Sequence, residues 1–154
     1  MRRWTIAMPA DPADEHILID TNVVILRRHL PPGAFSGEVS ISAVTLAELS
    51  AGPHLVTGNT PADIEERANR TAVLQRTESE FDPIPFGADA ARMFGRMAAA
   101  VMAAGHTPRR RNADLMIAAT AAVEGMPLYT MNPDDFQGLE KLVTIVALPR
   151  PSHA

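Results

Sequence analysis

The sequence contains no cysteine among its 154 residues, and it has only one lysine, one tryptophan and one tyrosine. Without cysteine, neither a disulfide nor a thiolate metal site can form, so a bound metal must be held by carboxylates, histidines or carbonyl groups. Carboxylates select hard cations such as Mg²⁺ and Mn²⁺. Any metal site in this chain is therefore expected to be acidic.

Long apolar runs are also absent. Two arginines follow Met1, but three acids arrive by residue 15, which is too soon for a secretory signal, and no stretch is long enough to span a membrane. We expect a cytoplasmic protein without membrane association. Residues 1–15 are predicted to form a flexible leader, in which Met8 is an alternative start, residues 16–148 one domain, and residues 149–154 a C-terminal tail.

An excess of basic charge is missing too, because the formal net charge is −4. Nucleic-acid-binding proteins usually carry a basic surface, so this charge argues mildly against such a partner. Two bound divalent cations would, however, cancel the net charge, and basic residues cluster at 27–29 and 106–111. Net charge alone does not decide the question.

Short β-branched runs alternate with longer alanine-rich stretches, which predicts an α/β fold with a central, mainly parallel sheet flanked by helices. The length suits a single domain, and the chain shows no internal repeat or linker. Strands are expected at 16–20, 39–42, 81–85, 128–130 and 142–148. Helices are expected at 23–29, 43–51, 61–78, 89–104 and 112–124.

Acidic residues follow the first two expected strands. Asp20 comes directly after the apolar run HILI, at the end of the strand where ligands bind in open α/β sheets, although it could simply cap the next helix. Glu48 lies in SAVTLAEL. If Ser42 caps that helix, Glu48 is free to act from the second turn; a cap at Thr45 would instead use Glu48 in a capping box.

Asp114 stands two positions after Asn112, which we expect to cap a helix. The helix dipole there favours an ionised carboxylate, as a metal ligand requires, but acids are also common in first turns. The segment LMIAATAAV that follows is apolar around most of its circumference. This helix is therefore predicted to be buried, with Asp114 at its N-terminal end.

A further acidic stretch follows the strand at 128–130. In LYTMNPDDF, Asn132, Asp134 and Asp135 lie just beyond the expected strand end, a composition also typical of a plain turn. We favour Asp135 over Asp134 as the inward-facing acid because its neighbour Phe136 must be buried.

The joint placement of these acids is more informative than any one of them. Parallel α/β topology brings strand ends to one rim, and carboxylates gathered there repel one another unless a cation offsets their charge. The predicted site is a hard-cation centre built from Asp20, Glu48, Asp114 and Asp135.

The segments LIDTNVVI, SAVTLAEL, NADLMIAATA and YTMNPDDF, in this order and spacing, resemble the PIN-domain ribonucleases, and among them the VapC-type toxins of bacterial type II toxin–antitoxin pairs. The resemblance covers residues 17–148. It implies a single PIN-like domain whose first three acidic ligands fall on Asp20, Glu48 and Asp114. For the fourth, many members carry aspartate where this chain has Asn132, while Asp135 matches the aspartate that precedes phenylalanine.

The same resemblance implies a function. It is that of a metal-dependent endoribonuclease that hydrolyses phosphodiester bonds of transfer, ribosomal or messenger RNA with one or two Mg²⁺ or Mn²⁺ ions. The implied partners are a small VapB-like antitoxin, whose C-terminal segment blocks the active-site groove, and a second copy of the chain in a homodimer.

Polar neighbours are predicted to support the acids. We expect hydrogen bonds from the two threonines to the carboxylates or to a phosphate, and orientation of Asp20 by Asn22. These supporting residues are Thr21, Asn22, Thr130 and Asn132. The basic residues Arg109, Arg110 and Arg111 are predicted to attract the RNA backbone, a solvated basic loop being the alternative.

Two other functions compete with this hypothesis. A phosphotransfer site with Asp20 as nucleophile would want a lysine, yet Lys141 lies far from these motifs. A domain that keeps the acidic rim but only binds RNA or a partner is the stronger alternative, and activity measurements separate it from a nuclease.

Overall fold

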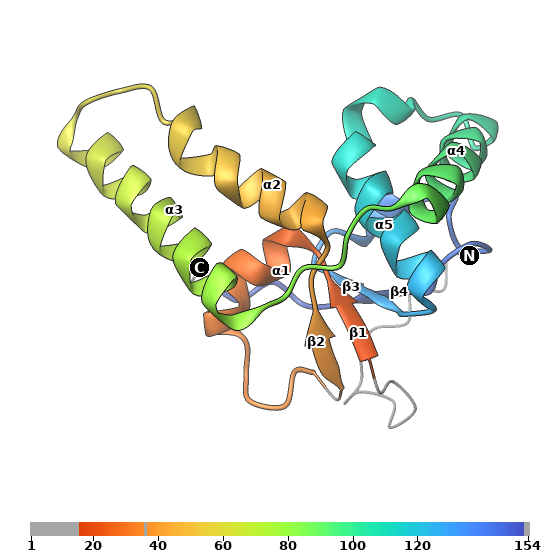
Figure 1. Cartoon of the computed structure of the whole chain (residues 1–154), viewed down its shortest axis with the longest axis horizontal. Coiled ribbons are helices and arrows are strands. Elements are labelled where there is room, and N and C mark those ends of the chain that lie inside the picture. Colours follow the sequence, from red (N-terminus) through yellow and green to blue (C-terminus); the bar gives the residue numbers. More distant parts are fainter. Residues whose placement is uncertain (1–15, 36, 153–154) are drawn as a thin grey trace.

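The computed structural model describes residues 16–35 and 37–152, so the expected leader at 1–15 lies outside the described residues (Figure 1). A four-stranded sheet forms the base of the molecule, with strand order β2-β1-β3-β4 and every pairing parallel. The strands are β1 (His16–Ile19), β2 (Glu38–Ser40), β3 (Leu128–Thr130) and β4 (Ile145–Ala147). The predicted parallel α/β fold is confirmed.

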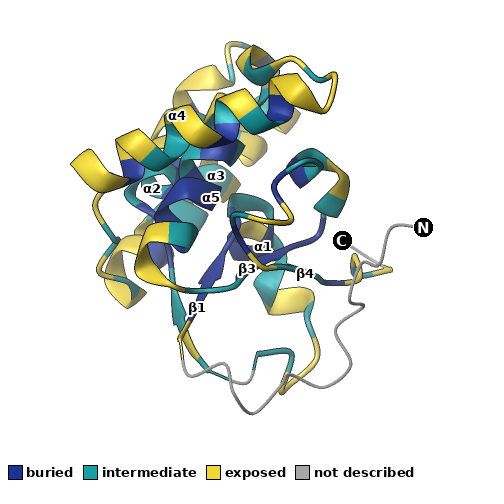
Figure 2. Ribbon diagram, turned by 90° about the vertical axis from the view of Figure 1, so that its right-hand side faces the viewer, coloured by how far each residue is buried: buried dark blue, intermediate teal, exposed yellow. Residues whose placement is uncertain are grey.

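The helices stand on this sheet in two groups (Figure 1). On one side, α2 (Ala43–Ala51) and α3 (Pro61–Glu80) run side by side as a projecting arm, with the short α1 (Thr21–Leu26) beneath them. On the other side lie α4 (Ala88–Ala103) and α5 (Asn112–Glu124). Figure 2 shows α5 largely buried beneath α4, whose outer face is exposed.

Strand β1 carries the two halves of the core. Successive side chains of a strand point to opposite faces, so Leu18 packs with α4 and α5 while Ile17 and Ile19 pack with α1 and α2. All three are fully buried. The carboxyl end of β1 is therefore held firmly between two apolar clusters, which fixes the residue that follows it.

Three boundary predictions are wrong in informative ways. Residues 81–85 form no strand of the sheet; Ile84 makes a single parallel bridge to Ser42. The expected strand at 142–148 shortens to β4 because residues 139–143 turn back through hydrogen bonds to Leu139 O. The short turn at 108–111 leads directly into α5, so Asn112 is the first helical residue rather than its cap.

The start of α2 resolves the question about Glu48. Ser42 is the cap, and its hydroxyl oxygen accepts a hydrogen bond from Val44 N at 3.1 Å. Glu48 is therefore not used in a capping box, and it projects from the second turn of α2. At the start of α3, Thr60 and Asp63 form a reciprocal capping box.

Candidate active site

Asp20 is fixed by its neighbours on both carboxylate oxygens. It follows β1 directly and is only 3% exposed. Thr21 N donates to Oδ1 at 2.7 Å and caps α1 in doing so, and the Thr130 hydroxyl donates to Oδ2 at 2.9 Å. Asp20 thus caps α1 with one carboxylate oxygen and accepts a hydrogen bond from β3 with the other. Burial raises the pKa of Asp20, although these two hydrogen bonds work in the opposite direction.

Glu48 is positioned by a chain of hydroxyl groups. Thr21 Oγ1 donates to Glu48 Oε1 at 2.6 Å and lies 3.1 Å from Thr45 Oγ1. A hydroxyl has one proton to donate, so Thr45 must be the donor to Thr21. Thr45 is fully buried, and its position one turn before Glu48 on α2 is the sequence signal that could have identified it.

Asp114 lies in the first turn of α5 and is partly buried. Burial, followed by the negative charges of Asp20, Asp135 and Glu48, raises its pKa to about 7, while Arg111 acts in the opposite direction. The four predicted acids therefore lie within electrostatic reach of one another, although they come from four separate segments of the chain.

The fourth acid is better matched by Asp135 than by Asp134. Asp135 is partly buried, and its charge raises the pKa of both Asp20 and Asp114. Asp134 is exposed, and its Oδ1 accepts a hydrogen bond from Gln137 Nε2 at 3.1 Å. Phe136 is fully buried, as expected, and this orients the turn at 133–136.

Asn132 supports the site through its backbone. Its N–H donates to Thr130 Oγ1 at 3.0 Å, and the same Thr130 hydroxyl donates to Asp20. Its side-chain oxygen accepts a hydrogen bond from Arg150 Nη2 at 2.9 Å. Arg150 was not predicted, and it connects the segment after β4 to the rim of the site.

The arginines before α5 differ in their surroundings. Arg111 Nη1 donates to the backbone oxygens of Asp134 at 3.3 Å and Asp135 at 3.1 Å. Arg111 thus holds the turn that carries Asp135, which the prediction of RNA contacts did not foresee. Arg109 is exposed, and the side chain of Arg110 lies outside the described structure.

A groove of about 460 Å³ opens beside the acids. Asp20, Glu48 and Asp114 line it together with the predicted supporting residues Thr21 and Asn22. Its other wall comes from the arm formed by α2 and α3. That wall presents apolar residues together with Glu66, Asn69 and Arg70, none of which the sequence motifs indicated.

The donor atoms of this cluster suit a hard divalent cation, because they are carboxylate and hydroxyl oxygens. Burial and then the charges of the neighbouring acids raise the pKa of Asp114, and a bound cation would offset those charges. Among the described residues no three acidic or histidine side chains are close enough to form a complete ligand set.

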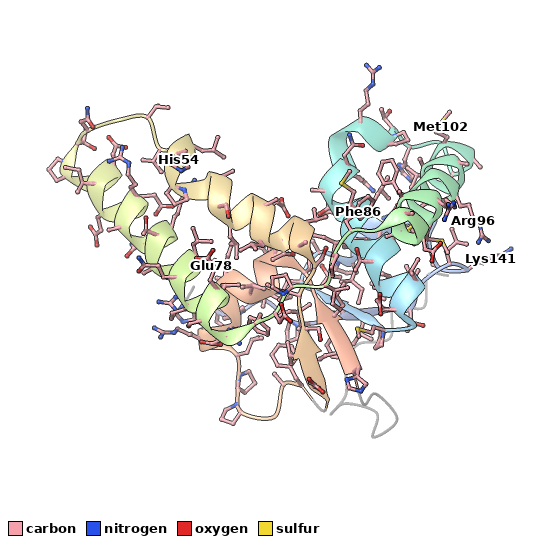
Figure 3. The ribbon with its side chains drawn as sticks, in the orientation of Figure 1. His54, Glu78, Phe86, Arg96, Met102 and Lys141 are labelled. Atoms are coloured by element: carbon pink, nitrogen blue, oxygen red, sulfur yellow. The ribbon has the colours of Figure 1, made fainter. Side chains whose placement is uncertain are left out.

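Lysine chemistry has no place in this cluster. Lys141, the single lysine, lies on the opposite side of the molecule from α2, the helix that carries Glu48 (Figure 3). It is exposed and borders a separate depression with Glu140 and Thr144. The phosphotransfer alternative therefore lacks the lysine it would need.

Comparison with known proteins identifies relatives over most of the chain. The family model for the PIN domain matches residues 17–142. The protein named Ribonuclease VapC5 from Mycobacterium tuberculosis is 34% identical over 131 residues, which cover 83% of this chain and 90% of that protein.

Solved structures agree with this assignment. A member of the VapBC family of toxin–antitoxin systems, VapBC-5 from Mycobacterium tuberculosis, superposes with a TM-score of 0.68 at 33% identity, covering 87% of this chain and 99% of that one. FitAcB from Neisseria gonorrhoeae shares the fold alone, with a TM-score of 0.62 at 24% identity, covering 90% and 99%. Family nucleases generally use divalent metal ions.

Proposed function

The chain belongs to the PIN-domain family, in its VapC group, and we propose that it is an endoribonuclease that depends on Mg²⁺ or Mn²⁺ and acts as the toxin of a VapBC-type pair. The observation that carries this proposal is the convergence of four carboxylates at the end of the parallel sheet, where Asp114 has a pKa of about 7. Asp20, Glu48, Asp114 and Asp135 are its proposed acidic residues.

The residues have distinct tasks in this mechanism. A divalent cation, when bound, would supply the positive charge that activates water and offsets charge on the phosphodiester, with one or two ions serving this purpose. Asp20, held on both oxygens by Thr21 N and Thr130, presents a fixed carboxylate. Glu48 is held by Thr21, and Asp135 by the turn that Arg111 clamps, so neither needs to reorganise when substrate arrives.

The substrate is proposed to be a transfer, ribosomal or messenger RNA, bound in the groove beside the acids. The groove is open to solvent on one side of the arm, and Asn22 and Asn69 offer amide groups there. Amides can hydrogen-bond either phosphate or base edges. The basic Arg109 lies in the segment just before α5 and provides a further, salt-sensitive contact.

A cleavage assay tests this function. Purified protein free of antitoxin is incubated with total cellular RNA and Mg²⁺, Mn²⁺ or excess chelator. We expect discrete fragments that require metal, and we expect Asp20→Asn to reduce cleavage by at least about 100-fold. Asp89→Asn is the matched control, because Asp89 is an exposed acid on α4 that pairs with Arg92.

Absence of cleavage by folded wild-type protein under every condition would contradict the nuclease proposal. The alternative that keeps the acidic rim but only binds RNA or a partner would then be favoured. Equal cleavage by wild type and Asp20→Asn would show that the Asp20 carboxylate is not needed for cleavage.

The antitoxin is proposed to occupy the same groove. VapBC-5, at 33% identity, is described as a toxin–antitoxin system, which supports a VapB-like partner for this chain. Leu49, Leu55 and Val73 line the groove together with the acids. An apolar segment carrying a basic side chain complements such a surface, and its binding would exclude RNA.

A homodimer in the cytoplasm completes the proposal. Ile64 on α3 and Met102 on α4 are more than half exposed, so each of these helices offers a large apolar side chain to an interface. Met102 is labelled in Figure 3. No described helix is long and apolar enough to cross a bilayer.

A further inference from the structure

Arg70 on α3 is a cation in the wall of the acidic groove. Its Nε donates to Glu66 Oε1 at 2.7 Å and its Nη1 to Gly52 O at 3.0 Å. The side chain remains 41% exposed, and it lines the same groove as Asp20, Glu48 and Asp114. Arg70 is the single basic residue among the described residues that line this groove.

These two hydrogen bonds fix the guanidinium in place. The bond to Gly52 O ties the guanidinium to the end of α2, and the bond to Glu66 ties it to the preceding turn of α3. Arg70 therefore links the two helices of the arm (Figure 1). Arginine has further N–H groups in the same plane, and they suit the oxygens of a phosphate. A cation held in advance loses little side-chain entropy on binding.

The position along the groove is set by α2. Gly52, to which Arg70 is bonded, follows Glu48 by four residues, which corresponds to about 6 Å along a helix axis. A nucleic acid strand that runs from the acids along α2 within this groove therefore reaches Arg70. The ligand that must enter this groove for cleavage thus presents anionic oxygens to this cation.

We propose that Arg70 binds a backbone phosphate of the RNA next to the cleavage position, and that Glu66 weakens this contact by sharing the guanidinium. This inference rests on the proposed ribonuclease function. The phosphate contact exists both before and during bond cleavage, so it lowers KM without changing kcat. Because the contact is to the backbone, it is independent of base sequence.

Steady-state cleavage of a fluorogenic RNA oligonucleotide tests the proposal between about 50 and 200 mM salt. For Arg70→Gln we expect KM to rise about fivefold with unchanged kcat. We also expect the slope of log(kcat/KM) against log[salt] to become shallower by about 0.7, the value for one lost phosphate contact on a single strand. Arg92→Gln is the control, since Arg92 lies on α4 in an exposed pair.

Glu66→Gln gives the opposite test, and it does not depend on the stability of the Arg70 variant. It removes a negative charge from the groove and leaves a neutral amide oxygen, which accepts a weaker hydrogen bond from Arg70 Nε, so KM should fall while Arg70 keeps its bond to Gly52 O. Wild-type values of KM and salt slope in Arg70→Gln, or an unchanged KM in Glu66→Gln, would overturn the inference. Because wild type must cleave the oligonucleotide for either comparison, these results are distinct from a failure of the nuclease proposal itself.

Discussion

Asp114 is the side chain whose ionisation the site changes most clearly. Its pKa is raised from 3.8 to about 7 by burial and by the neighbouring acids. Between these values the folded protein holds a proton that the unfolded chain has released, so the free energy of unfolding falls as pH rises through this window.

Metal-free protein should therefore be more stable at pH 5 than at pH 8. We expect a loss of about 1–2 kcal/mol, smaller than the full pKa shift implies because Asp114 is partly exposed. Denaturant unfolding with chelator measures it. Asp114→Asn should flatten the pH dependence and be the more stable protein at pH 8. A wild-type stability that rises from pH 5 to pH 8 would contradict this assignment.

Asp134 and Asp135 form a matched pair of adjacent acids with different surroundings. Asp135→Asn should reduce RNA cleavage by about 10- to 100-fold, because its carboxylate faces Asp20 and Asp114. Asp134→Asn should keep wild-type activity, because its side chain is exposed and bonded to Gln137. The reverse ranking of the two variants would make Asp134 the fourth acid.

The sequence predicted which acids lie near one another and that Thr21 and Thr130 donate to carboxylates, but it did not predict the contacts of Arg111. Asp20, Glu48, Asp114 and Asp135 follow local signals, namely strand ends, a helix start and a buried aromatic neighbour. The contacts of Arg111 with the oxygens of residues 134 and 135 depend on tertiary approach across more than 20 residues, for which no local pattern exists.

Helix α2 positions Glu48 through Thr45 and the Thr21 hydroxyl of α1. Thr45→Val keeps the shape of the side chain but removes the donor, so Thr21 Oγ1 loses the hydrogen bond that holds it beside Glu48. We expect about a fivefold to tenfold loss of cleavage with little change in stability, as for one buried hydrogen bond. Thr45→Ser should restore activity. Equal loss in both variants would indicate a packing effect instead.

Element boundaries were predicted where local chemistry decides them. The extents of α2 and β3 match, and Gly125 ends α5 with a φ of 67° as expected for a left-handed cap. The expected strand at 81–85 failed because Pro83 and Pro85 lack N–H groups. Within this segment only Ile84 hydrogen-bonds the neighbouring backbone at 41–43: its N–H donates to Ile41 O, and its carbonyl oxygen accepts from Ala43 N.

At the scale of the whole molecule, the parallel sheet gathers the acids at one end and the arm of α2 and α3 adds a wall beside them. The alternation of strands and helices predicted the sheet. It could not predict the arm's contribution to the groove, because α3 is largely exposed and its lining residues follow no motif. The order of the parallel strands thus positions the acids, and the packing of α2 against α3 forms the wall of the groove beside them.

The most direct test of a metal centre at these four acids is Mn²⁺ binding by calorimetry at pH 7, in buffers of different ionisation enthalpy. We predict one or two bound ions per chain, with proton release because Asp114 is partly protonated at this pH. Asp114→Asn should lose the proton release and bind at least about 10-fold more weakly. Wild-type protein that binds no Mn²⁺, or an Asp114→Asn variant with unchanged affinity and proton release, would contradict the central claim.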